Sequence, residues 1–111
     1  MTDSGNNVVR LPNDFIGKAE EVKLESFGAH LIAHGAATRW HWRRSNGFDV
    51  EFEVFRGGSD EELLVRISRD KSRSTFHAVD ASGGRVAQGS LEHVMTVVDS
   101  IARSDRPEPP A

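Results

Sequence analysis

Apolar residues recur along the chain with two different periods, and each change of period marks a boundary between predicted elements. In the first segment they lie three to five residues apart, which is the spacing of one buried stripe on a helix. This stripe comprises Phe15, Ala19, Val22, Phe27 and Leu31. Asn13 is a good N-cap, and Gly35 suits the left-handed residue that follows a helix. We therefore predict a helix over residues 13–34, with Gly28 as a candidate bend.

A period of two begins at the tryptophans and predicts a β-hairpin. Trp40 and Trp42 alternate with basic residues, and residues 48–54 alternate between apolar and acidic side chains. Residues 45–47 (SNG) form a three-residue loop between these runs, in which glycine supplies the positive φ angle. The tryptophans are accordingly predicted to lie in the core rather than on a platform for stacking bases. The register that follows has two apolar pairs and three charge-complementary pairs: Trp42 with Val50, Trp40 with Phe52, Arg43 with Asp49, His41 with Glu51, and Arg39 with Glu53.

Three further strands and a second helix complete the pattern. Residues 61–69 predict a strand with Leu63, Val65 and Ile67 on one face. Residues 74–80 predict another, whose orientation stays open because both of its faces mix apolar and polar residues. A Gly-Gly turn leads to a short strand, RVAQG, which precedes a helix capped by Ser90. The apolar stripe of this helix comprises Leu91, Val94, Met95, Val98 and Ile101.

The order of elements predicts an α+β fold. It is a two-layer sandwich with an N-terminal helix, an antiparallel meander of four or five strands and a C-terminal helix. One domain spans residues 12–103. Residues 1–11 are predicted to be a flexible arm, and residues 104–111, which hold three of the four prolines, a disordered tail.

The composition excludes several classes of function. The 111 residues include 14 Lys and Arg against 17 Asp and Glu, a net charge of −3, which argues against a strongly basic nucleic-acid binder. Cysteine is absent, so disulfides, thiolate metal sites and cysteine nucleophiles are excluded. We find no phosphate-binding glycine loop and no nucleophile elbow. No signal peptide or membrane span is recognisable, so we expect a cytoplasmic protein that needs no cofactor and is not an enzyme.

The histidines are the candidates for a metal site. His30 and His34 stand four residues apart and so share one face of the first predicted helix. Further ligands could come only from the distant His41, His77 and His93. The glutamate of an HExxH motif is missing from HLIAH. The simpler interpretation is that His34 complements the dipole at the C-terminal end of the helix and that His30 flanks the core stripe. A metal-dependent activity is therefore kept as an alternative.

One local run is basic, and it is the candidate partner-binding segment. Residues 66–73 (RISRDKSR) lie at a predicted turn between two strands and carry a cluster of cations. These are Arg66, Arg69, Lys71 and Arg73, to which we add Arg44, left unmatched by the predicted hairpin register. Such a tip suits either a protein partner or the phosphates of a nucleic acid.

Taken together, these features predict a small bacterial protein that binds another protein. Its class would be an adaptor, an inhibitor or an immunity-type module, which acts through a charged sheet face and an edge strand. Self-association through that edge makes a homodimer a further expectation. The alternatives are a nucleic-acid-binding domain that uses residues 66–73 and the metal-dependent activity at the histidines.

Overall fold

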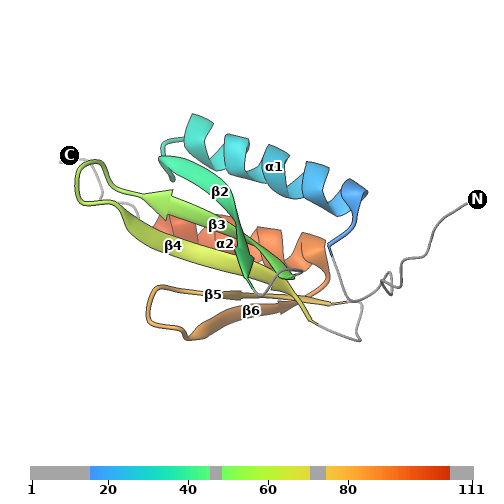
Figure 1. Cartoon of the computed structure of the whole chain (residues 1–111). Helices are drawn as coiled ribbons and strands as arrows, with labels where there is room; N and C mark the ends of the chain where they lie inside the picture. Colours follow the sequence, from blue (N-terminus) through green and yellow to red (C-terminus); the bar gives the residue numbers. More distant parts are fainter. Residues whose placement is uncertain (1–15, 46–48, 71–74, 106–111) are drawn as a thin grey trace, which may run out of the picture.

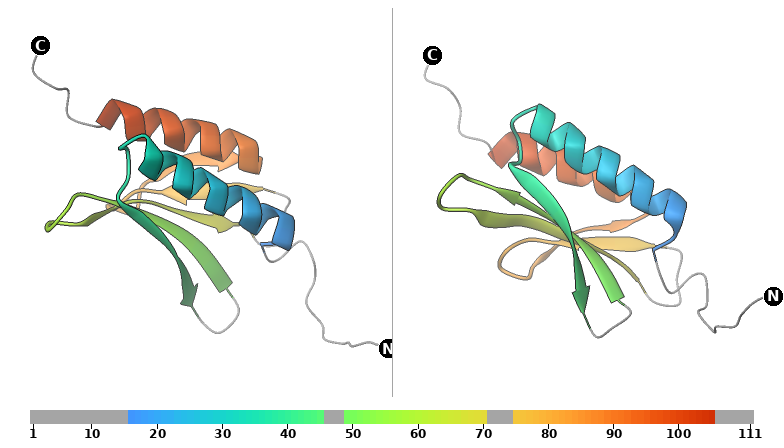
Figure 2. Two further views of the ribbon diagram at one scale, coloured as in Figure 1. Left: turned by 90° about the horizontal axis from the view of Figure 1, so that it is seen from above. Right: turned by 45° about the horizontal axis from the view of Figure 1, so that its top comes forward.

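The chain folds into one antiparallel sheet with two helices packed on a single face, as predicted (Figures 1 and 2). The computed structural model describes residues 16–45, 49–70 and 75–105. The strands follow the chain order β2-β3-β4-β5-β6 across the sheet. Over these residues neither helix is long and apolar enough to span a bilayer. The elements are α1 (Lys18–Ala33), β2 (Arg39–Ser45), β3 (Asp49–Arg56), β4 (Glu62–Arg69), β5 (Phe76–Val79), β6 (Arg85–Gly89) and α2 (Leu91–Asp105).

Helix α1 starts later than predicted and buries a different stripe. Its N-cap is Gly17 rather than Asn13, and Glu20 accepts a 2.8 Å hydrogen bond from the Gly17 amide. The predicted stripe is wrong at two described positions, because Ala19 is exposed and Val22 is 52% exposed. Positions spaced four and three residues apart face the sheet instead, and these are Leu24, Gly28 and Leu31. Phe27 packs beside them, whereas Phe15 lies outside the described residues.

The end of α1 was predicted correctly. Gly35 has a φ of 75°, the left-handed conformation that glycine adopts without a steric cost. The Ala36 amide donates to the Leu31 carbonyl at 2.9 Å, and the Gly35 amide donates to the Ile32 carbonyl at 3.0 Å. These two bonds make a Schellman motif, which satisfies carbonyls that the helix leaves open and turns the chain into β2.

Gly28 marks a close contact rather than a bend. Helix α1 runs through it without interruption, and the Trp40 indole packs directly over its Cα. A Cβ atom on Gly28 would lie 2.5 Å from Trp40 Cδ1 and 2.9 Å from Phe52 Cζ. No other residue type fits there without displacing an aromatic ring, so the glycine sets how closely α1 approaches the sheet.

The β2–β3 hairpin has the predicted faces, but the predicted register is wrong by two residues. Trp42 lies opposite Phe52 and Trp40 opposite Val54, and the strands pair up to Ser45 and Asp49. The connection is therefore residues 46–48, which lie outside the described part, instead of residues 45–47. Side chains alternate with a period of two, so a two-residue shift keeps every side chain on its predicted face.

The tryptophans pack against the core, as predicted. Each indole is partly buried against Phe52, with ring centroids 5.4 Å from Trp40 and 5.0 Å from Trp42. The Trp42 indole N–H donates to Glu25 of α1 at 2.8 Å, which satisfies the one polar atom of that side chain. This bond also fastens α1 to the edge strand.

An irregularity between β3 and β4 corrects the predicted face of β4. The pairing shifts by one residue between Val54 and Phe55, so the alternation reverses at this point. Val65 and Ile67 are buried as predicted, but Leu64 is buried in place of Leu63. Leu63 instead lies opposite Phe55 and is half-buried.

The last two strands and α2 complete the core. Phe76 and Ala78 are buried, which settles the orientation of β5 that the sequence left open. The Ser90 hydroxyl accepts from the His93 amide at 3.1 Å, the predicted N-cap of α2. Four members of the predicted stripe of α2 lie in or against the core, namely Leu91, Val94, Met95 and Val98, and Ala102 is buried with them. Ile101, the fifth, is half-buried. Helix α2 continues to Asp105, so residues 104 and 105 are helical rather than part of the tail.

Candidate functional site

The sheet surface opposite the helices carries polar side chains from all five strands. Buried side chains on β3 and β4 alternate with these polar ones, as the pleat requires. In the described part of the chain no helix or strand lies over this surface (Figure 2). We call it the open face, and it comprises Arg39, His41, Arg43, Glu51, Glu53, Phe55, Arg66, Ser68, His77 and Gln88.

Glu53 lies at the centre of the open face and is buried, with 5% of its surface exposed. Arg66 Nε donates to Glu53 Oε2 at 2.8 Å, and His41 Nε2 lies 2.6 Å from Oε1. Burial by itself would raise the pKa of Glu53, but the hydrogen bonds from Arg66 and His41 outweigh it and lower the pKa. Glu53 is therefore a buried carboxylate with a basic side chain on each side.

His41 connects two other members of the open face. Its Nδ1 lies 2.9 Å from Arg39 Nη1, and its Nε2 lies 2.6 Å from Glu53 Oε1. The half-exposed ring is therefore held between Arg39 and Glu53.

Arg39 and Phe55 lie together at one end of the open face. Arg39 makes two hydrogen bonds to Glu61, from Nε at 2.7 Å and from Nη2 at 2.8 Å. Its guanidinium lies 4.2 Å from the centroid of the half-buried Phe55 ring. A bidentate ion pair and an aromatic contact thus hold one side chain in a single position.

Glu51 extends the network to β4. It accepts from Arg43 Nη1 at 3.1 Å and from Ser68 Oγ at 2.9 Å, and Arg66 Nε lies 3.8 Å away. Ser68 in turn lies opposite His77 on β5, which lies opposite Gln88 on β6. One polar row therefore crosses all five strands.

Asp70 closes this row at the end of β4. His77 Nδ1 lies 2.5 Å from one carboxylate oxygen, and Thr75 Oγ1 donates to the other at 2.8 Å. The Asp70 amide also donates to the Thr75 carbonyl at 2.9 Å. Burial would raise the pKa of Asp70, but the hydrogen bonds from Thr75 and His77 lower it. Asp70 thereby joins the two ends of the β4–β5 connection.

The candidate basic cluster divides between the two faces of the sheet. Arg66 bonds to Glu53 on the open face, whereas Arg69 reaches α1 on the other face and bonds to Glu20 at 3.1 Å. Lys71 and Arg73 lie outside the described residues. Arg66 and Arg69 are three residues apart, and on a strand that spacing places them on opposite faces. The alternation of the strand was the signal that could have separated them.

Arg44 is exposed but is not the unmatched charge that we predicted. It lies opposite Val50 in the observed register, and its side chain is not without a partner. The predicted register placed it at the loop, where no acidic residue faced it. In the observed register its cross-strand neighbour is still not acidic, so the partner of Arg44 was not predictable from the hairpin alone.

The two candidate metal ligands lie together on α1. The His30 and His34 rings meet edge to face, with centroids 4.4 Å apart. His30 Nε2 lies 3.5 Å from Asp99 Oδ1 of α2. Across residues 16–45, 49–70 and 75–105, no group of three His, Asp or Glu side chains is arranged to hold a metal ion. His30 thus contacts both His34 on its own helix and Asp99 on α2.

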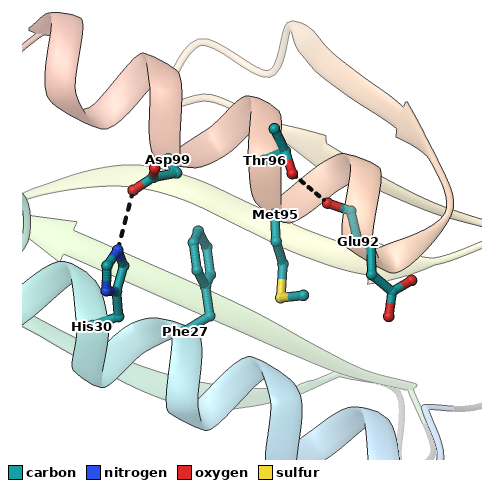
Figure 3. A pocket seen from close by; sticks show the side chains of 6 residues that line it. All are labelled: Phe27, His30, Glu92, Met95, Thr96 and Asp99. Atoms are coloured by element: carbon teal, nitrogen blue, oxygen red, sulfur yellow. Dashed lines mark hydrogen bonds and ion pairs between the residues drawn. The ribbon is translucent and has the colours of Figure 1, made fainter.

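A shallow groove of about 300 Å³ separates the outer surfaces of α1 and α2 (Figure 3). Phe27 and Met95 point toward each other in it. Its charged side chains are already engaged, because Glu92 accepts from Lys23 at 2.7 Å and Asp99 Oδ2 accepts from Arg103 at 3.0 Å. The Lys23–Glu92 pair joins α1 to α2, whereas the Arg103–Asp99 pair lies within α2.

The open face defines the protein as an α+β two-layer domain with a charge-balanced, uncovered sheet. Comparison of the chain with protein-family models, curated proteins and solved structures gave no significant match. What the domain does must therefore be argued from its own surface.

The stability of the fold should fall in acid because of Glu53 and Asp70. The folded-state pKa of each is lowered, so each stabilises the fold above its unfolded pKa, about pH 4. That contribution is lost as the pH falls through the folded-state pKa. Urea unfolding between pH 7 and pH 3 should show this decline.

A matched variant assigns the acid effect. We expect Glu53→Gln to lower the free energy of unfolding at pH 7 by about 1 kcal/mol and to flatten the decline below pH 5. Glu21→Gln, at a half-exposed site on α1 whose ion pair with the exposed Lys18 is a 4.0 Å contact, is the control and should behave like the wild type. An undiminished acid decline in Glu53→Gln would contradict the assignment.

Proposed function

We propose that the protein is a non-enzymatic protein-binding module that contacts its partner through the open face. The observation that carries this proposal is the hydrogen-bonded, charge-balanced network centred on the buried Glu53. An adaptor, an inhibitor or an immunity-type protein of the bacterial cytoplasm is the class that we propose.

The order of the open face favours binding to a protein. Arg39, His41 and Arg66 are each held by hydrogen bonds before any partner arrives. Fixed side chains lose less conformational entropy on association, which leaves more of the contact energy as affinity. Phe55 and its neighbouring arginines are residue types that are enriched in protein interfaces.

The charge balance of the open face argues against a nucleic-acid ligand. Arg39, Arg43 and Arg66 are bonded to Glu61, Glu51 and Glu53 respectively. A polyanion would have to compete with these carboxylates, and it would gain less from releasing counterions than on a bare basic surface. A protein surface of mixed charge meets no such opposition.

The test is an affinity pull-down from the source cell, with and without nuclease. The variant Phe55→Ala alters the open face, and Lys18→Ala, whose side chain is 88% exposed on α1, is the control. We expect a partner protein to be retained by the wild type and by Lys18→Ala and to be lost by Phe55→Ala, with or without nuclease. Circular dichroism and a melting curve establish that each variant is folded.

Two outcomes would overturn this proposal. Retention that disappears on nuclease treatment would identify nucleic acid as the ligand. Equal loss of the partner by Lys18→Ala and Phe55→Ala would place the contact elsewhere.

The paired arginines also predict weak binding to polyanions. Because Arg66 and Arg69 are held by Glu53 and Glu20, we expect the protein to elute from a heparin column below roughly 0.15 M salt. Retention at higher salt that is lost in Arg66→Ala would contradict this prediction and favour the nucleic-acid alternative.

A further inference from the structure

Strand β2 forms an edge of the sheet, with β3 as its only strand neighbour among the described residues. It is seven residues long and approximately as long as the central strands. The opposite edge, β6, is five residues long and leads through Ser90 directly into α2, which packs on it (Figure 1). A long edge strand presents a row of backbone donors and acceptors on which another strand can pair.

The side chains of β2 determine which strand could be added. On the open face the strand presents Arg39, His41 and Arg43, with 43–48% of each side chain exposed. On the helix face it presents Trp40 and Trp42, both partly buried. An added strand would therefore meet basic side chains on one of its faces and indole rings on the other.

The residues of β3 that face β2 show which side chains complement its alternation of basic and aromatic residues. It places Glu51 opposite Arg43 and Glu53 opposite His41, and it places apolar residues opposite both tryptophans. The free side of β2 offers the same alternation to a second strand. Arg43 uses Nη1 for Glu51, and a guanidinium has five N–H donors, so it can bind a carboxylate on each side.

A second copy of the chain does not fit this edge. Antiparallel pairing of β2 with β2 of another copy would place Arg39, His41 and Arg43 opposite the same basic residues. Like charges directly opposite each other destabilise a sheet. The edge therefore disfavours the homodimer that the sequence led us to expect, and it selects a strand of opposite charge.

We infer that β2 accepts, by strand addition, an extended segment of a protein partner in which acidic and apolar residues alternate. This inference rests on the proposed function, since it names the chemistry of a partner at the edge of the open face. An acidic residue of the segment would lie against Arg43, whose guanidinium has donors beyond the one given to Glu51, and its apolar residues would lie beside Trp40 and Trp42.

The test uses three synthetic peptides and the fluorescence of the protein. Both tryptophans of the chain are in β2, so their emission reports on this edge. The first peptide alternates Glu and Val, and the second alternates Lys and Val. The third is the acidic peptide with every amide N-methylated, which removes the hydrogen-bond donors of both edges and keeps the charge.

We expect a saturable change of emission with the acidic peptide and affinities at least about tenfold weaker for the other two. Arg43→Glu should weaken the acidic peptide by a similar factor and improve the lysine peptide, and Arg43→Gln should lie between. Lys18→Glu makes the same charge change on α1 and should leave both affinities unchanged. Hydrogen exchange should show new protection of β2 amides in the acidic complex.

Three outcomes would overturn the inference: equal affinity for the acidic and lysine peptides, undiminished binding of the N-methylated peptide, or a dimer formed through β2. These are distinguishable from a failure of the proposed function, which is read from the Phe55→Ala pull-down. The pull-down could capture a partner in a Phe55-dependent way while the acidic peptide fails to bind. In that case the open face would remain the proposed binding site, and only strand addition at β2 would be rejected.

Discussion

Replacing Phe52 by alanine should lower the free energy of unfolding by about 3–5 kcal/mol. Phe52 is fully buried and touches both tryptophan rings, so its removal leaves a cavity that both indoles border. The surrounding sheet and α1 can close only part of that space, because the strand backbones are fixed by their hydrogen bonds. Urea unfolding monitored by tryptophan fluorescence measures the loss.

Phe55→Ala is the matched control for this prediction. It removes the same side chain from the same strand, three residues away, at a half-buried position on the open face. Less apolar surface returns to water there and no enclosed cavity forms, so we expect a loss of about 1–2 kcal/mol. Equal losses in the two variants would contradict the assignment of Phe52 to the core and Phe55 to the surface.

Gly28→Ala should destabilise the protein by about 2 kcal/mol, although alanine is the better helix former. The gain in helix propensity is about 1 kcal/mol. Against it stands the new Cβ, which would lie 2.5 Å from Trp40 Cδ1 and 2.8 Å from Trp40 Cγ. Forcing a methyl group into such a contact costs up to about 3 kcal/mol, because the indole or the helix has to move. Thermal or urea unfolding gives the net sign directly.

A double-mutant cycle with Trp40→Leu isolates the contact. Once the indole is gone, Gly28→Ala should become nearly neutral or stabilising, with a coupling energy of about 2–3 kcal/mol. Gly58→Ala is the control, since a Cβ there has nothing within 4 Å and its φ is not in the left-handed region. If Gly28→Ala destabilised both backgrounds equally, Trp40 would not be the cause.

The alternation of side chains explains why the faces of the hairpin were predictable although its register was not. Alternation specifies only whether a residue faces the core, so Trp40 and Trp42 were placed correctly in either register. The register depends on which residues form the loop, and SNG and the residues one step later are both compatible with a three-residue turn. Packing of Phe52 against both indoles is a tertiary contact that no local signal contains.

The remaining errors have the same origin. Gly28 was not counted as a core position, because a glycine becomes one only when a ring packs on it. Leu64 turns inward at an irregularity for which the β4 sequence has no local marker. The acidic and basic alternation predicted a charge-complementary face, but the pair between Arg39 and Glu61 joins segments that the hairpin alone does not connect.

The strand order has a consequence for how the chain folds. Every strand in the meander pairs with the strands next to it in the sequence, so the sheet can grow one hairpin at a time. Each step closes only a short loop, and the entropic cost of loop closure rises with the length of chain enclosed. A topology of such local contacts belongs with the faster mixed α/β domains, which fold on the order of milliseconds. The tryptophans of β2 would then be exposed only briefly before α1 docks on them, whereas in the described part of the chain the edge of β2 stays open.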